Sequence, residues 1–240
     1  MPKPVDREDF PNCEFCPYVQ HGPWWVCVPC ASESLSSITD PCPICSQERE
    51  GDWCRNRLCN GQEGEIFIER IEAITLFVDP LPQIVHRYKY EHKYGWAQIF
   101  ARLLIGHLET HWDLAEVDLI AANPSGNDRD HTGRVLKSAK VQDFLDWWPF
   151  DDTDDPAFEK PGATPQSAGG TIAEKRQAAV QHANALRLLR PDLVGGKQIV
   201  VYDDICTTGL QLNAVARQLR QWGAESVSGI VLARQPWGGP

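Results

Sequence analysis

From about residue 64 onward, short apolar, β-branched runs alternate with longer amphipathic segments. Alternation of this kind is typical of α/β proteins, in which helices flank a parallel sheet. A stretch over 149–170 is rich in Pro, Gly and Asp without periodicity, so we expect a flexible loop there. Strands are predicted within 64–79, over 117–122, at 199–201 and over 226–233, and helices over 84–112 (one long or two short), 134–148, 171–190 and 210–222.

The last two predicted helices have clear start, stop and facing signals. Thr171 and Glu174 have the capping-box spacing, and Gly223 ends the final helix. Because apolar positions repeat with helical spacing, each helix is expected to bury one face. These faces are Ala179, Val180, Ala183, Leu186 and Leu189 for the first helix, and Leu212, Val215, Ala216, Leu219 and Trp222 for the second.

The stretch IVVYDDICTTGLQL joins a strand, an acidic pair, a hydroxyl-rich loop and a helix start. Its apolar run suits a strand buried on both faces of a parallel sheet, and such sheets bind ligands at the carboxyl ends of their strands. Asp203 and Asp204 can accept hydrogen bonds from two vicinal hydroxyls, and Thr207, Thr208 and Gly209 offer hydroxyls and amides to a phosphate. The order predicts a sugar-phosphate site; a plain turn capped by Thr208 is the alternative.

Charge and leader signals limit the function classes. The chain has 240 residues and a net charge of −10. Over 1–65, five Lys and Arg stand against eleven Asp and Glu, which argues against a strong nucleic-acid footprint on this part. No secretory signal or transmembrane run is recognisable, so no membrane insertion is expected, and we expect a cytoplasmic protein.

Eight of the nine cysteines lie in the first quarter of the chain, in four closely spaced pairs. In a reducing compartment, such clusters indicate metal more often than disulfides, which remain the alternative. Eight thiolates make two closed, structural Zn²⁺ sites. Short intervals favour sequential pairing, and a cross-braced pairing stays open. The ligand sets are Cys13, Cys16, Cys27 and Cys30, and then Cys42, Cys45, Cys54 and Cys59.

Aromatic, imidazole and basic residues supply several weaker signals. Trp24, Trp25 and Trp53 are expected to cover the metal sites, with base stacking as the alternative. The segment HRYKYEHKYGW fits an amphipathic helix and, less well, a surface for single-stranded nucleic acid. Histidines show no paired metal spacing, and His86 and His92 are expected at the surface.

The DDICTTG segment resembles the phosphoribosyl-diphosphate (PRPP) motif of type I phosphoribosyltransferases. By this resemblance, Asp203 and Asp204 hold the ribose hydroxyls and serve as the catalytic pair. Gln211 departs from the Thr that the family often has at its position. The implied phosphoribosyl-binding residues are Asp203, Asp204, Ile205, Cys206, Thr207, Thr208, Gly209, Leu210 and Gln211.

The order of cysteine ribbons, a Lys-Tyr-bearing helix and a carboxy-terminal PRPP motif resembles the ComF family, which is linked to DNA uptake and DNA use in bacteria. The resemblance implies a double zinc-ribbon module over 1–64 and a phosphoribosyltransferase-like α/β domain over 65–240. It also covers the Gln- and Arg-bearing stretch from 164 to 176. The basic run that the family has after its second strand is missing here. By position, Asn123, Pro124, Ser125 and Gly126 would form the pyrophosphate loop.

Two functions follow from the resemblance. The first is transfer or sensing of a 5-phosphoribosyl group with Mg²⁺, in which charge stabilisation performs the catalysis and Arg129, Arg134, Lys175 or Arg176 supplies positive charge. The acidic segment 151–155 would then face solvent or a partner. The alternative is a non-catalytic adaptor in DNA transport or recombination, which binds DNA-uptake proteins or single-stranded DNA through Lys89 and Lys93.

Overall fold

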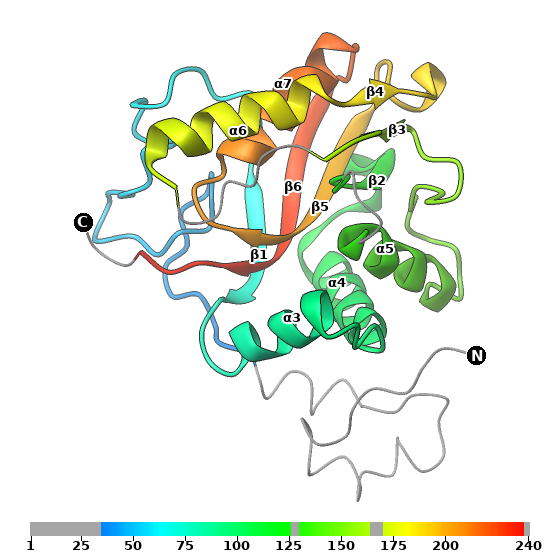
Figure 1. Cartoon of the computed structure of the whole chain (residues 1–240), viewed down its shortest axis with the longest axis horizontal. Helices are drawn as coiled ribbons and strands as arrows, with labels where there is room; N and C mark the ends of the chain where they lie inside the picture. The colour runs from blue at the N-terminus through cyan, green and yellow to red at the C-terminus, as the bar shows by residue number, and fades with distance from the viewer. Residues whose placement is uncertain (1–34, 126–129, 164–169, 238–240) are drawn as a thin grey trace, which may run out of the picture.

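The computed structural model describes residues 35–125, 130–163 and 170–237, which form an α/β fold (Figure 1). Four parallel strands form the main sheet in the order β1-β6-β5-β2. A second, antiparallel pair consists of β3 and β4. The strands are β1 (Ile71–Leu76), β2 (Leu119–Ala122), β3 (Phe158–Glu159), β4 (Arg187–Leu188), β5 (Gln198–Cys206) and β6 (Ser226–Arg234).

Helices cover both faces of this sheet, as the alternating pattern predicts (Figure 1). One face carries α3, α4 and α5, and the other carries α6 and α7. The segment 84–112 forms two helices, separated where His92 adopts a left-handed φ of 58°. The helices are α3 (Leu81–Tyr90), α4 (Trp96–His111), α5 (His131–Gln142), α6 (Ile172–Asn184) and α7 (Leu210–Gln221), with 3₁₀ turns η3 (Leu114–Glu116) and η4 (Pro191–Leu193).

The central strand β5 is apolar on both sides, which explains its continuous hydrophobic run. Val200 and Tyr202 face the α4 and α5 side, whereas Ile199 and Val201 face the α6 and α7 side. All four side chains are at most 1% exposed. The prediction of a doubly buried strand is therefore confirmed, and β5 is fixed between two packed layers.

The prediction of a helix over 134–148 is wrong at its C-terminal end, because α5 stops at Gln142. The Asp143 carboxylate accepts a hydrogen bond from the Trp148 amide at 2.7 Å, which turns the chain. Trp148 enters the core, but Trp147 is 56% exposed. Trp237 is 43% exposed and Trp53 54% exposed, so neither side chain is buried in the core. Trp24 and Trp25 lie outside the described residues.

The helix predicted over 171–190 also ends early, at Asn184, although its Thr171 capping box is confirmed. The residues after it leave the helix to pair β4 with β3, and the Leu189 amide donates to the Ala157 carbonyl. Leu189 is consequently 41% exposed rather than inward. Local periodicity could not reveal this, since the competing partner lies about thirty residues away in sequence.

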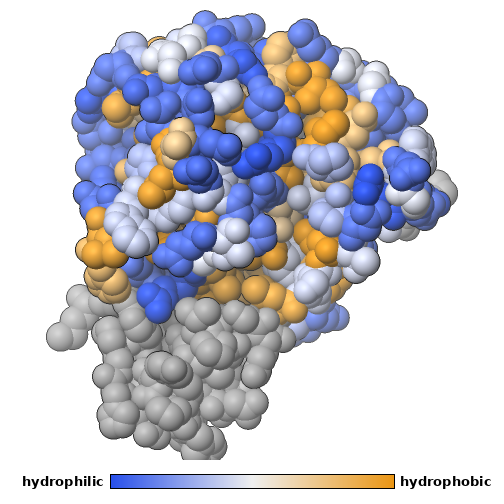
Figure 2. All heavy atoms as spheres, turned by 180° about the vertical axis from the view of Figure 1, so that it is seen from behind, coloured by the Kyte–Doolittle hydropathy of each residue, from blue (hydrophilic) through white to orange (hydrophobic). Residues whose placement is uncertain are grey.

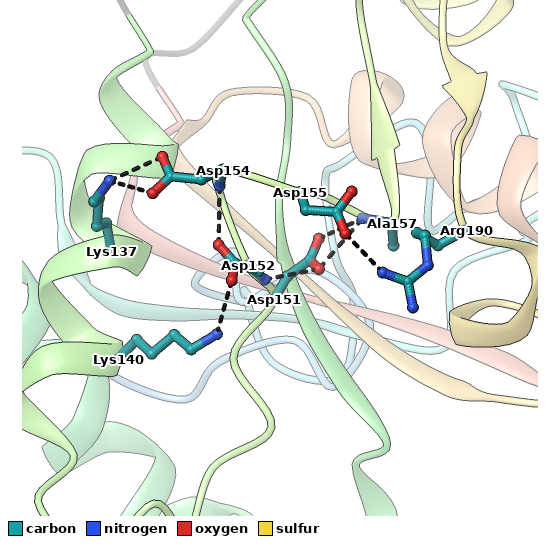
Figure 3. A network of polar contacts seen from close by, with 8 residues as sticks. All are labelled: Lys137, Lys140, Asp151, Asp152, Asp154, Asp155, Ala157 and Arg190. Carbon is teal, nitrogen blue, oxygen red and sulfur yellow. Dashed lines mark hydrogen bonds and ion pairs between the residues drawn. The ribbon is translucent and has the colours of Figure 1, made fainter.

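The acidic segment after α5 is ordered, against the expectation of a flexible loop, over the part that the structure describes. Its carboxylates pair with cations of neighbouring elements, and Asp151 accepts from the Ala157 and Asp152 amides (Figure 3). Asp151 is 5% exposed, and burial raises its pKa. The segment therefore contributes one buried carboxyl as well as a solvated face. The ion pairs are Lys137–Asp154, Lys140–Asp152 and Arg190–Asp155.

Hydrophilic side chains cover most of the face seen from behind, and hydrophobic ones form separate patches between them (Figure 2). Within the described part of the chain, no helix combines the length and apolarity that crossing a membrane requires.

Asn213 of α7 holds the segment that enters β1. Its Oδ1 accepts from the Phe67 amide at 2.8 Å and from the Ile68 amide at 3.3 Å, and its Nδ2 donates to the Glu65 carbonyl at 3.1 Å. The side chain is 8% exposed.

Asn213→Ala is expected to lower the free energy of unfolding by about 2–3 kcal/mol, because buried amides lose their acceptor. Urea unfolding measures this value. Asn184→Ala, at the exposed end of α6, is the matched control and should change it by less than about 1 kcal/mol. Equal effects in the two variants would contradict the assigned role.

Candidate functional site

The acidic pair stands at the carboxyl end of the sheet because β5 extends beyond its neighbour. The last residue of β2, Ala122, pairs with Tyr202, and β5 continues through Cys206 beside β6. Asp203 and Asp204 therefore lie within the strand rather than after it. The early end of β2 leaves one side of these residues open to other groups.

Asp203 is held by hydrogen bonds from two donors. Asn123 Nδ2 donates to its Oδ2 at 2.7 Å, and the Asp204 amide donates to its Oδ1 at 2.8 Å. Burial, followed by the charge of Asp204, raises the pKa of Asp203 to about 7. This carboxyl therefore exchanges a proton near neutral pH unless a ligand or cation changes its surroundings.

A buried polar chain continues from Asn123. Its Oδ1 lies 2.8 Å from His182 Nε2, and His182 Nδ1 lies 3.0 Å from Lys160 Nζ. Asn123 uses its amide nitrogen on Asp203, and Lys160 is a donor, so an imidazole protonated at Nε2 satisfies all three contacts. Burial, and then the charge of Lys160, lowers the pKa of His182 to about 3. The histidine is therefore neutral and fixes the orientation of Asn123.

Asp204 pairs with Lys89, which comes from α3 on the other side of the site. Although burial by itself disfavours the ammonium, the charge of Asp204 outweighs it and raises the pKa of Lys89. The two acidic neighbours thus have different partners: a neutral amide for Asp203 and a cation for Asp204. A ligand that binds Asp204 must share it with this ammonium or displace it.

Residues 207–211, called here the 207–211 loop, comprise the turn between β5 and α7 and the first two residues of α7. Gly209 has a φ of 79° and precedes the first turn of α7. A Cβ at this position would lie 2.9 Å from Ile71 Cδ1 and 3.1 Å from Leu58 Cδ2. Glycine is therefore required both by conformation and by space.

A hollow of about 50 Å³ borders this loop and also contacts Asp203 and Lys175 of α6. Amides at the start of α7 and the Lys175 ammonium make this end of the sheet suitable for an anion. The other basic candidates are engaged elsewhere: Arg176 pairs with Glu63, and Arg134 stacks on Tyr94 at 4.1 Å. Arg129 lies outside the described residues.

The stretch expected to bind pyrophosphate is partly committed to the fold. The Asn123 amide donates to the Tyr202 carbonyl at 2.9 Å, so it extends the sheet instead of facing a ligand. Pro124 has no amide hydrogen, and Gly126 lies outside the described residues. Pro124 and Ser125 line a cavity of about 440 Å³ together with Ala122, Asp130, Gly133, Asp151, Thr153, Asp154, Pro156, Phe158, Glu159, Lys160 and Pro161.

Four cysteine thiols meet beside β1. The Sγ atoms of Cys42, Cys45, Cys54 and Cys59 all lie within 4.8 Å of one another. The Cys42–Cys59 and Cys45–Cys54 separations are 3.8 and 3.7 Å. Tetrahedral zinc with bonds of about 2.3 Å requires sulfur separations of about 3.8 Å. The four cysteines therefore fit one zinc ion, in the sequential set predicted.

The neighbouring thiols of Cys45 and Cys59 lower the pKa of Cys42 well below its ordinary value, and the same contact between Cys42 and Cys59 raises the pKa of Cys59. The other predicted set, Cys13, Cys16, Cys27 and Cys30, lies outside the described residues. The ninth cysteine, Cys206, is buried, and Arg234 Nη1 donates to its Sγ at 2.6 Å.

Sequence reasoning missed Lys89, Lys160 and His182 as members of this site. The sequence predicts Lys89 on an amphipathic helix, Lys160 in a flexible loop and His182 on a helix, and no motif marks Lys160 or His182. Their contacts join residues far apart in the sequence. Lys89 and Asp204 are 115 positions apart, Asn123 and His182 are 59 apart, and Lys160 and His182 are 22 apart. His86 and His92 are exposed, as predicted.

No protein-family model matches this sequence, and no curated protein matches it.

The neutral state of His182 predicts a pH dependence of stability. Its pKa is lower in the folded chain than the value of about 6.5 in an unfolded one, so its contribution is complete above pH 6.5 and is lost as the pH falls toward 3. Between pH 6.5 and 4, this group should lower the free energy of unfolding by about 3 kcal/mol. Urea unfolding across this range measures the loss.

His182→Gln should remove that part of the pH slope, since glutamine does not ionise. His86→Gln, at a side chain that is 62% exposed, is the control and should retain it. The same slope in both variants would show that His182 is charged in the folded protein.

The metal site predicts a specific loss of zinc. The sequence predicts two zinc ions per chain, and Cys45→Ser should reduce the content to one, because a set of three thiolates binds much more weakly. Elemental analysis of purified protein gives the ratio. Cys206→Ser is the matched control and should leave it unchanged. Full zinc content in Cys45→Ser would contradict the assigned site.

Proposed function

We propose that this protein is a phosphoribosyltransferase-like protein of the ComF type, which binds PRPP with magnesium and transfers its 5-phosphoribosyl group. The observation that carries the proposal is the position of the acidic pair and the 207–211 loop on consecutive residues at the carboxyl end of β5. Ligands of parallel α/β sheets bind at this end. The four-cysteine cluster agrees with the ribbon module of that family, although clusters of this kind also occur in unrelated proteins.

In this proposal, the 5-phosphate binds the amides of the 207–211 loop at the start of α7, next to Lys175. The ribose hydroxyls donate to Asp203 and Asp204. Because the ribose hydroxyls and Lys89 share the Asp204 carboxylate, the Lys89 ammonium then shifts from Asp204 toward the ligand. The chain from Asn123 to Lys160 holds Asp203 while this exchange occurs.

The reaction breaks the bond between ribose C1 and the pyrophosphate oxygen, and the bonding electrons leave with pyrophosphate. A lone pair of the acceptor forms the new bond to C1, and no protein nucleophile is required. When bound, Mg²⁺ neutralises the leaving pyrophosphate, and the hard oxygen atoms of Asp203 and Asp204 are suitable neighbours for it. The protein stabilises charge and orients both reactants.

The 440 Å³ cavity beside Ser125 is the proposed acceptor space. Its volume lies within the range of sites for small molecules. Its lining combines acidic and basic groups. They are the carboxyl groups of Asp130, Asp151, Asp154 and Glu159, of which Asp151 is buried, and the ammonium of Lys160.

The adaptor alternative has less support among the described residues. It relies on Lys89 as a contact for single-stranded DNA, but Lys89 is half-buried and paired with Asp204. Its charge therefore belongs to the acidic site rather than to an open surface.

Asp204→Asn combined with Thr208→Val is expected to raise the Kd for PRPP at least about 100-fold. The double variant removes the charge-assisted hydrogen bond from the ribose to Asp204 and the Thr208 hydroxyl that binds the phosphate. Calorimetric titration of zinc-loaded protein with PRPP and Mg²⁺ measures the constant. Zinc content and circular dichroism should stay unchanged.

A matched control combines Thr110→Val with Asp113→Asn. Both positions are exposed; Thr110 lies in the last turn of α4, and Asp113 lies just before η3. This pair should bind PRPP like the wild type. Retained affinity in the Asp204 and Thr208 variant would show that PRPP binds elsewhere, and the absence of binding by wild-type protein would contradict the proposed function.

A further inference from the structure

The four-cysteine module lies directly against the 207–211 loop. Asn56 Nδ2 donates to the Thr208 carbonyl at 3.1 Å, across 152 positions of sequence. Asn56 is 3% exposed, so water does not compete effectively for this bond. The carbonyl that accepts it belongs to the loop and immediately precedes Gly209.

Asn56 is fixed by the chain segment that carries two of the thiols. It lies between Cys54 and Cys59, and its carbonyl accepts from the Cys59 amide at 3.0 Å. Its Oδ1 also accepts from the Leu58 amide at 3.1 Å. The orientation of the Asn56 side chain therefore depends on the turn that brings Cys59 to the metal position.

Leu58, from the same turn, packs against the loop at Gly209. It is fully buried, and a Cβ on Gly209 would lie only 3.1 Å from its Cδ2. This close packing leaves no room for Gly209 to move toward the module. A displacement of Leu58 would open space under the loop and remove its support.

The first cysteine pair reaches the same region through Arg234. Gln47 closes the turn around Cys42, whose amide donates to the Gln47 carbonyl at 2.8 Å. The Gln47 Oε1 accepts from Arg234 Nε at 3.0 Å, and Arg234 Nη1 donates to Cys206 Sγ. Arg234 is 1% exposed, so this connection runs through the interior. Both halves of the cysteine set are thus connected to residues 206–209, the first through Gln47 and Arg234 and the second through Asn56 and Leu58.

We propose that the metal ion in the cluster of Cys42, Cys45, Cys54 and Cys59 positions the 207–211 loop through Asn56 and Leu58, so that metal binding and anion binding at the loop are thermodynamically coupled. Without the ion, the turn from Cys54 to Cys59 loses its closure, and the loop loses a hydrogen bond and its packing surface. Linkage then requires that a ligand of the loop also stabilises the bound metal. The identity of that ligand as PRPP rests on the proposed function; the coupling of metal to loop order does not.

Hydrogen exchange of the full-length, zinc-loaded protein tests the coupling without any ligand. Asn56→Ala should speed exchange of the 207–211 amides about 10-fold or more, with unchanged zinc content and unchanged protection of β2. Asn60→Ala is the matched control, since the Asn60 side chain accepts from Gln62 within its own turn, and it should leave loop exchange as in the wild type. Unchanged loop exchange in Asn56→Ala would overturn the proposal.

Titration with PRPP and Mg²⁺ tests the ligand half. Asn56→Ala should weaken binding about 10-fold relative to Asn60→Ala, although it removes no residue of the loop. Faster exchange with unchanged PRPP affinity would overturn the coupling of the metal to this ligand. If wild-type protein binds no PRPP, the proposed function fails, and the exchange experiment still decides whether the turn from Cys54 to Cys59 orders the loop through Asn56.

Discussion

The half-buried carboxyl of Asp203 is the constraint on which the site depends. A carboxylate at the end of a doubly buried strand loses hydration, and its pKa rises unless donors compensate. Here Asn123 and the Asp204 amide supply the donors, and His182 and Lys160 hold Asn123 in place. The early end of β2 creates the space for this arrangement. The same interactions that stabilise the strand end thus orient a polar group toward the open edge of the sheet.

The strand-loop-helix unit could be predicted because its signals are local. An apolar run, an acidic pair and a glycine with a required positive φ all lie within one short stretch, and each part of the structure agrees with that order. The thiol set from Cys42 to Cys59 was equally local in its spacing. The ends of α5 and α6 could not be predicted, because Asp143 and β3 capture residues whose periodicity continues as a helix. Lys89 and His182 reach the site through tertiary contacts that no spacing encodes.

The four-cysteine cluster and the acidic strand end are parts of one structural unit. The cysteine turns do not form an independent appendage: the Ile71 amide donates to the Ile44 carbonyl at 2.7 Å, and Ser46 Oγ donates to the Ile71 carbonyl at 2.9 Å. β1 therefore connects the thiols to the main sheet, and Asn56 connects them to the 207–211 loop. A closed zinc site without an open coordination position is suited to this supporting role.

A crystal structure of the zinc-loaded protein with PRPP and Mg²⁺ would test the central claim most directly, because it would locate the phosphorus atoms. Our account predicts the 5-phosphate at hydrogen-bond distance from the amides of the 207–211 loop, with the ribose hydroxyls on Asp203 and Asp204. A 5-phosphate bound away from this loop, for example beside Arg176 and Arg217 between α6 and α7, would contradict it.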